Sequence, residues 1–197
     1  MDKTPLPTEL SSALAMLCDE GSPVDWKVPA DTPREIGRPA LLPLAEIVAS
    51  AGSPEVARRA RWALRRLDVA DPGAYAPLLR HSDAEVRDHA LFAFQTRPEA
   101  ASGYVDRLTP SLGDPETQVR RRAVTTFKEI GTAAVPALRR LRQRPATGPR
   151  IRATAVEALA GIGGPAALDD RDLAAWRRLT RIKQLTETPE RPHLCGS

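Results

Sequence analysis

A pattern of three apolar positions recurs four times along the chain, and it limits the possible folds more than any other feature. Each copy has a β-branched residue, an alanine four positions later and a large apolar residue after four more. The first members lie 30, 33 and 32 residues apart. A spacing of four places all three on one helix face, and this period is typical of stacked helical hairpins. The copies read Val56, Ala60 and Leu64; Val86, Ala90 and Phe94; Val119, Ala123 and Phe127; Ile151, Ala155 and Leu159.

Residues suited to a helix start come before each copy. Ser53, Asp83 and Asp114 can accept hydrogen bonds from the free amides of a first turn, and Gly148 is tolerated in the fourth copy. A proline follows three of these four residues, where its missing N–H is harmless. We therefore expect a helix to begin at each of these points.

A shorter leucine-rich helix is expected before each of these second helices. These first helices fall at about residues 39–48, 74–79, 102–108 and 134–141. Proline recurs before or within their leucine-rich turns, where it kinks or delays a helix. Aromatic residues make up only 4% of the chain, so the core must be built mainly from small aliphatic side chains. The recurring prolines are Pro43, Pro77, Pro110 and Pro136.

The predicted fold is all-α, a right-handed α–α superhelix of about four to five helical hairpins. We expect an N-terminal helix and capping segment over 1–36 and four repeats within 37–169. A C-terminal helix and a proline-rich tail are expected over 170–197. This last helix either caps the array or is half of a fifth hairpin in a longer protein. The expected repeats span about 37–67, 68–97, 98–130 and 131–163.

Several copies resemble HEAT repeats, including the HEAT-like repeats of phycobilisome-lyase-type proteins. The resemblance covers about residues 37–185 and rests on an Asp, a Val-Arg pair and an Ala in each of two copies, with an Ile-Gly pair at the end of the second. These are Asp83, Val86-Arg87 and Ala90, then Asp114, Val119-Arg120, Ala123 and Ile130-Gly131. The resemblance implies that the arginine packs against an acidic residue of a neighbouring repeat. Arg87, Arg120 and Arg152 match this position, whereas the first repeat has Ala57 there.

Charge and composition leave two interpretations open. The chain has 29 basic and 25 acidic residues, and 25 of the basic ones are arginines. Arginine clusters can mark a nucleic acid or an acidic protein as partner, but a GC-rich genome also favours arginine over lysine. The charge changes sign along the chain, which argues against nonspecific binding to a nucleic-acid duplex.

Localisation follows from what the sequence lacks. The two cysteines, Cys18 and Cys195, have neither the spacing of metal ligands nor that of a disulfide framework. No apolar run is long enough for a membrane span, and the first residues do not resemble a signal peptide. We therefore expect a cytoplasmic protein without a membrane partner. The oligomeric state is not indicated.

The candidate binding surface consists of the outward positions of the second helices. Trp62 is expected to face outward with arginines one turn away on either side, and Phe92 occupies the corresponding position in the next repeat. The alternative is that the N-terminal segment, through Trp26 or Leu10, covers Trp62. The residues expected to bind a partner are Arg58, Trp62, Arg65, His89, Phe92, Arg121 and Arg122.

The function predicted from these features is that of a non-enzymatic adaptor that binds a protein partner, with a nucleic-acid-binding module as the alternative. An activity like that of HEAT-like DNA glycosylases would need a carboxylate beside the outward aromatic residue, and none shares the face of Trp62. No residue can be assigned to a bilin-lyase-like role. Five residues of the metal-binding types cluster in sequence, namely His81, Asp83, Glu85, Asp88 and His89. Asp83 and Glu85 are explained by the helix start, however, and His81 lies in the turn before it. No catalytic, metal-binding or cofactor-binding residue is therefore assigned.

Overall fold

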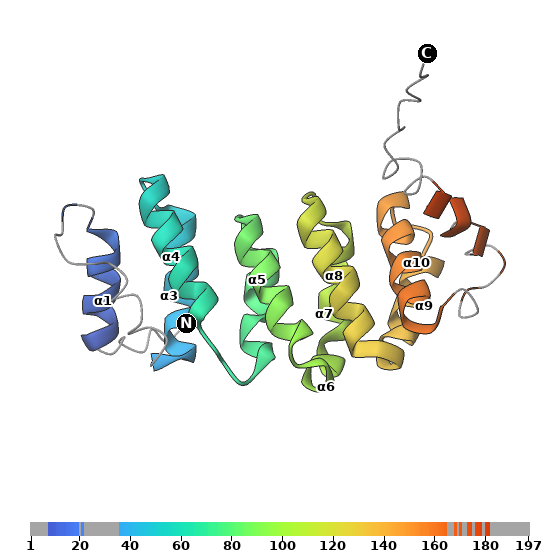
Figure 1. Cartoon of the computed structure of the whole chain (residues 1–197), viewed down its shortest axis with the longest axis horizontal. Helices are drawn as coiled ribbons and strands as arrows, with labels where there is room; N and C mark the ends of the chain where they lie inside the picture. The colour runs from blue at the N-terminus through green and yellow to red at the C-terminus, as the bar shows by residue number, and fades with distance from the viewer. Residues whose placement is uncertain are drawn as a thin grey trace, which may run out of the picture.

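The computed structural model describes residues 8–19, 21 and 36–164, together with 168, 170, 173–174, 176–178 and 180–181. The helices stack side by side in an elongated row of antiparallel pairs (Figure 1). Within the described residues, all regular secondary structure is helical. The predicted all-α solenoid is therefore confirmed.

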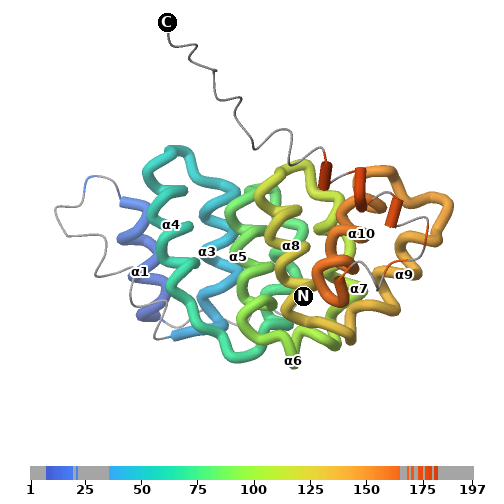
Figure 2. Tube along the Cα trace, turned by 45° about the vertical axis from the view of Figure 1, so that its right-hand side comes forward, coloured from blue at the N-terminus to red at the C-terminus, as the bar shows by residue number. Residues whose placement is uncertain are grey.

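The second helices of the pairs form one layer of the row, and the first helices form the other (Figures 1 and 2). The second helices are α4 (Pro54–Arg66), α5 (Ala84–Gln95), α8 (Thr117–Ile130) and α10 (Pro149–Gly163). The first layer begins with α3 (Arg38–Ser50), followed in the second repeat by the 3₁₀ helix η1 (Pro72–Arg80). In the third repeat it consists of four short pieces, α6 (Pro98–Ala101), η2 (Ser102–Tyr104), α7 (Val105–Leu108) and η3 (Thr109–Gly113). It ends with η4 (Gly131–Ala134) and α9 (Val135–Gln143).

The recurring apolar stripe forms the core, as its periodicity predicts. The alanine in the middle of each stripe has no exposed surface, because the neighbouring helix approaches closely there. Phe94 and Phe127, at the ends of two stripes, are also fully buried. Ile151 is half-buried and packs closely on Gly113, where a Cβ atom would lie 2.6 Å from Cγ1 of Ile151.

Two of the predicted helix starts are capped as expected. The Ser53 hydroxyl accepts from the Val56 amide at 3.2 Å, and the Asp83 carboxylate accepts from two amides of α5. The third start differs, because α8 begins two residues after Pro115. Asp114 instead accepts from the Glu116 amide at 2.9 Å in the preceding loop, where it is buried.

The first layer is less regular than the second because prolines interrupt it. The segment around Pro77 forms a 3₁₀ helix, and residues 98–113 are broken into four short helical pieces that contain two prolines. Proline has no backbone N–H to donate within an α-helix, and its ring clashes with the preceding turn. Pro43 is nevertheless accommodated inside α3.

At the N-terminal end, helix α1 (Thr8–Cys18) packs beside α4. Its leucine face is buried, and Arg59 of α4 donates to the carbonyl of Asp19 at 3.2 Å. Trp26, the other residue considered as a cover for Trp62, lies outside the described residues, as does most of 170–197. In the part of the chain that the structure describes, no helix is both long and apolar enough to cross a bilayer.

Candidate binding groove

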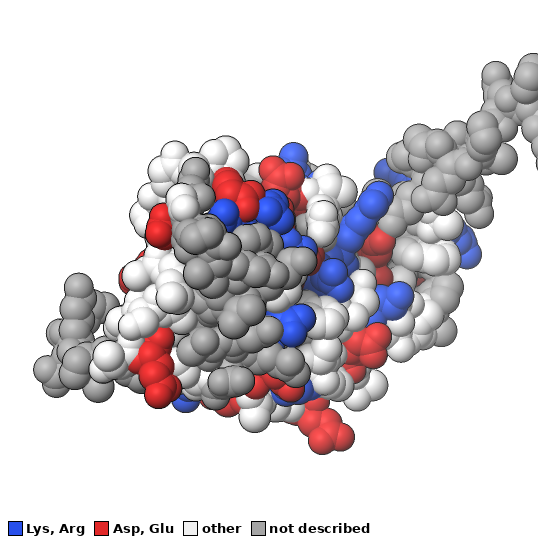
Figure 3. Space-filling model, turned by 60° about the vertical axis from the view of Figure 1, so that its left-hand side comes forward, with Lys and Arg blue, Asp and Glu red and all other residues white. Residues whose placement is uncertain are grey.

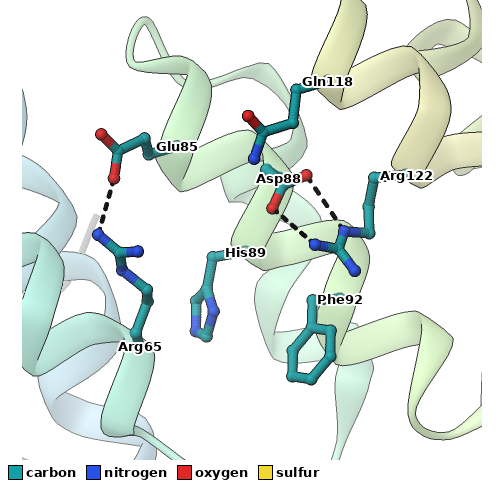
Figure 4. Close-up of a pocket in the computed structure, with 7 residues that line it drawn as sticks. All are labelled: Arg65, Glu85, Asp88, His89, Phe92, Gln118 and Arg122. Carbon is teal, nitrogen blue, oxygen red and sulfur yellow. Dashed lines mark hydrogen bonds and ion pairs between the residues drawn. The ribbon is translucent and has the colours of Figure 1, made fainter.

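Two adjoining hollows lie on the layer of second helices. The first has a volume of about 480 Å³ and lies among α4, α5 and α8; the second, of about 540 Å³, lies between α5 and α8. They share Asp88, Gln118 and Arg122, so they form one continuous depression, which we call the groove. Figure 4 shows the lining of the first hollow, Arg65, Glu85, Asp88, His89, Phe92, Gln118 and Arg122. The second also includes Thr117, Arg121 and Thr125.

Arg122 is held in a fixed position between α5 and α8. Its guanidinium donates to both carboxylate oxygens of Asp88, at 3.1 and 3.3 Å, and to the Gln95 side chain at 3.2 Å. Its Cζ atom lies 5.3 Å from the ring centroid of Phe92, a cation–π distance. Phe92 is 43% exposed. The ring of Phe92 is therefore exposed to solvent beside the guanidinium of Arg122, whose charge is already paired with Asp88.

The α4 side of the groove is held by arginine–carboxylate pairs. Arg65 donates to Glu85 at 2.8 Å, and both side chains are more than half exposed. One turn earlier, Arg61 donates to Asp83 at 2.8 Å, with both side chains about one-fifth exposed. These contacts join α4 to the first turn of α5.

His89 forms the buried part of the lining. It is 8% exposed, its ring lies edge-on to Tyr75 with centroids 5.6 Å apart, and its Nε2 atom has no hydrogen-bond partner among the described residues. Burial lowers the pKa of His89 to about 4, helped by the positive charge of Arg65 and opposed by the Leu64 backbone. The imidazole is therefore neutral at pH 7.

Five of the seven residues predicted to bind a partner line the groove. Arg65, Phe92 and Arg121 are exposed, Arg122 is half-buried and His89 is buried rather than outward-facing.

Arg58 and Trp62 are not among the lining residues of the groove. Arg58 lies on the surface of α4 and donates to Glu55 at 2.7 and 2.9 Å. These bonds, with one from Arg59, lower the pKa of Glu55 to about 2. Trp62 is half-buried and packs against the core, with Arg66 stacked 4.6 Å from its ring centroid. Of the predicted aromatic pair, Trp62 and Phe92, only Phe92 therefore lines the groove.

Three polar residues of the first hollow were missed by the sequence analysis. Glu85 was assigned only to the start of α5, although its side chain also reaches Arg65. Asp88 is the residue of the second repeat that corresponds to Arg58 of the first. An acidic residue at a position that is basic in the neighbouring repeat indicates an ion pair with the next helix, and Asp88 does pair with Arg122 of α8. Gln118 carries no comparable signal, because an exposed glutamine in a first turn is common.

The arginines after the branched anchors behave differently from one another. Arg87 reaches the next repeat and forms two bonds with Asp114, at 2.7 and 2.9 Å. All three arginines donate to backbone carbonyls of the loops that precede their own helices, but among the described residues only Arg87 also pairs with an acidic residue of the next repeat. The expected acidic partner is missing for Arg120, because the next repeat has Gly148 at the position of Asp114.

The cluster of histidine and carboxylates near residue 81 is engaged in local bonds. His81 Nε2 lies 3.0 Å from the Ala45 carbonyl, and its Nδ1 accepts from the Asp83 amide at 3.0 Å. Across the described ranges, no group of three His, Cys, Asp or Glu side chains is placed to hold a metal ion.

The comparison with known protein families agrees with the repeat architecture. The family described as HEAT repeats matches residues 105–170. An engineered protein of known crystal structure is 18% identical, with 93% of this chain and 91% of that one covered and a TM-score of 0.43. A designed armadillo repeat protein, solved with the peptide (KR)4, is 18% identical over 93% of this chain and 94% of that one, with a TM-score of 0.40. No curated protein matches the chain. Residues 105–170 thus match HEAT repeats, within a chain whose described residues form a helical-repeat fold.

Proposed function

We propose that this protein is a non-enzymatic adaptor that binds a segment of a partner protein in the groove across α4, α5 and α8. The observation that carries the proposal is the exposed ring of Phe92 on a rigid support. Interfaces are centred on a few large anchors in well-packed surroundings. Phe92 has such surroundings, since Arg122 behind it is fixed by three hydrogen bonds to Asp88 and Gln95. We expect the protein to act in the cytoplasm, because its two cysteines suit a reducing compartment.

The shape of the groove supports a protein segment as the ligand. Its two hollows together extend from Arg65 on α4 to Thr125 on α8. A ligand that fills both crosses α5 and reaches the helices on either side of it. An extended peptide can do so and place successive side chains over different helices.

A nucleic acid is the less favoured ligand. Binding to phosphates needs a continuous basic track, but Glu85 and Asp88 stand in the middle of the groove and pair with its arginines. In Figure 3, which turns the α1 side of the molecule forward, acidic and basic side chains are interspersed over the described surface.

Photo-crosslinking tests the proposal at a defined position. A photoreactive amino acid replaces Gln118, which is exposed and lines both hollows, and in a control it replaces Arg139, which is exposed on α9 in the first layer. The full chain is irradiated in a lysate of the cells from which the sequence comes. We expect defined protein adducts from position 118 that are absent from position 139 and are lost in the Trp62→Ala/Phe92→Ala variant.

Two outcomes would contradict the proposal. Adducts that disappear on nuclease treatment would favour the nucleic-acid alternative. Equal adducts from positions 118 and 139 would show that the groove is not the binding surface. Circular dichroism of the double variant is the control for folding, because Trp62 packs against the core. If that variant has lost its helicity, the single variant Phe92→Ala replaces it.

A further inference from the structure

The layer of second helices is strongly basic. Helices α4, α5, α8 and α10 carry twelve arginine and lysine residues and five acidic residues, a net charge of +7, whereas the whole chain has a net charge of +4. Two of these arginines, Arg61 and Arg87, pair with Asp83 and Asp114, which lie just before α5 and α8 and are not counted. With these two partners included, the net charge of the layer is +5. Such a surface attracts acidic partners and increases their rate of association.

Within the groove, one arginine remains available to a ligand. Arg65 and Arg122 are paired with Glu85 and Asp88. Arg121 is exposed in the second hollow, and its guanidinium has no ion pair or hydrogen bond with the described residues. A guanidinium of this kind can bind a carboxylate through two parallel hydrogen bonds without first giving up another partner.

The first hollow, which adjoins the hollow of Arg121, offers an apolar contact. Phe92 is one of three large apolar side chains that are exposed in the described part of the chain, and neither of the other two, Met16 and Leu42, belongs to the groove. Next to it, the buried His89 is uncharged at pH 7. An apolar side chain of a ligand can cover Phe92 without desolvating an unpaired charge.

We infer that the groove binds an acidic segment of a partner protein, with an apolar side chain on Phe92 and a neighbouring carboxylate on Arg121. This inference rests on the proposed function and adds the chemistry of the partner. The hollows that contain the two residues share Arg122, so both contacts lie within reach of one short extended segment. The apolar contact supplies specificity, and the net positive charge of the layer attracts the acidic residues around it.

An acidic peptide fits the groove better than a nucleic acid does. A nucleic acid carries a phosphate at every unit of its backbone, and some of these phosphates would lie against Glu85 and Asp88. A peptide carries charge only on chosen side chains, so it can place carboxylates at Arg121 and uncharged groups beside Asp88.

Fluorescence anisotropy with the full chain tests this inference. The probes are short synthetic peptides: an acidic peptide with a central Phe, the same peptide with a central Ser, and a lysine-rich peptide with a central Phe. A single-stranded oligonucleotide of the same charge as the acidic peptide is the fourth probe. We expect the acidic Phe peptide to bind most tightly and the Ser peptide to bind about tenfold more weakly, since a buried aromatic side chain is lost.

Matched variants place the binding in the groove. Arg121→Glu should weaken binding of the acidic Phe peptide by about tenfold or more. Arg139→Glu makes the same change of net charge on α9, outside the groove, and should weaken binding by less than about threefold, because only the long-range attraction is reduced. Phe92→Ala should abolish the difference between the Phe and Ser peptides, and Phe92→Leu should retain part of it.

Each failure has a distinct meaning. If the lysine-rich peptide binds best and loses affinity in Phe92→Ala, the acidic preference is wrong and the protein-binding groove stands. If the oligonucleotide binds more tightly than every peptide, both proposals are wrong. Equal effects of Arg121→Glu and Arg139→Glu would also overturn the inference, as would the absence of binding by the acidic Phe peptide at about millimolar concentration.

Discussion

The junction between α4 and α5 differs from the junction between α5 and α8, although both join neighbouring copies of one repeat. At the α5–α8 junction, Arg87 and Asp114 form a two-fold hydrogen-bonded pair whose side chains are 10% and 6% exposed. At the α4–α5 junction, the pairs of Arg61 with Asp83 and of Arg65 with Glu85 are partly open to solvent. One junction is held by a buried ion pair, and the other is held by pairs that remain partly exposed.

A single residue accounts for much of this difference. The arginine that binds the next repeat at the second junction is Arg87, and the corresponding residue at the first junction is Ala57. Asp83, which occupies the place of Asp114, therefore pairs with Arg61, one helical turn further along α4. The link therefore lies at a more exposed position than the pair of Arg87 with Asp114.

The largest expected effect separates the two junctions directly. Arg87→Ala leaves the Asp114 carboxylate buried without its partner, so we expect the free energy of unfolding to fall by about 3–5 kcal/mol. The same change at Arg61 removes a partly exposed pair and should lower it by about 1 kcal/mol. Urea unfolding of both variants measures the two values. Equal losses would mean that the junctions do not differ as described.

The second prediction uses the low pKa of His89. The unfolded histidine has a pKa near 6.5 and the folded one near 4, so the unfolded chain binds a proton first as the pH falls. Stability is therefore lost between about pH 6.5 and pH 4 and does not change further below that. His89 should contribute a loss of about 2 kcal/mol between pH 7 and pH 5.

His89→Gln should remove this contribution, as seen by urea unfolding at the two pH values. The charged groups that act on His89, namely Arg65, Asp88 and Arg122, are unchanged in the variant. Asp83 and Glu55, whose pKa values are also lowered, titrate alike in both proteins and cancel in the difference. An unchanged pH dependence would mean that His89 is more accessible than the structure shows.

The third prediction restores the repeat pattern at the first junction. In the Arg61→Ala background, Ala57→Arg supplies an arginine at the position equivalent to Arg87. We expect it to recover about 0.5–1 kcal/mol of the loss by pairing with Asp83. A double-mutant cycle measured by urea unfolding gives the coupling. No recovery would indicate that the residue at 57 does not determine how the junction is linked.

The smallest expected effect is that of Phe92. Its side chain is exposed and makes no part of the buried core, so Phe92→Ala should change the free energy of unfolding by no more than about 0.5 kcal/mol. Phe94→Ala, two residues away in the same helix, removes a fully buried ring and should cost about 3–5 kcal/mol. If the two variants are equally destabilised, Phe92 is a core residue and not an anchor for a ligand.

Much of the fold could be predicted because its determinants are periodic. The stripe of branched, small and large residues identified the second helices and their buried faces, and it gave the four alanines at their contacts. The break-up of residues 98–113 into short pieces could not be predicted. Proline indicates that a helix is disturbed, but the packing of its neighbours decides whether a 3₁₀ turn or a kink results.

The groove was predictable only in part, because it depends on relations between repeats. Aligning the repeats gave Arg121, Arg122 and Phe92 as outward positions, and these do line the groove. The burial of His89 follows instead from the ring of Tyr75, which approaches it from η1. Periodicity within one helix cannot reveal a contact made by another.

The central claim is that the groove is the ligand-binding surface, and an NMR titration tests it most directly. The acidic Phe peptide is added to the full ¹⁵N-labelled chain, and backbone amide shifts are followed. We predict that the largest changes fall in α5 and α8, at residues 85–92 and 118–125, and at the end of α4 near Arg65. Changes concentrated instead in α9, at residues 135–143, would contradict the account.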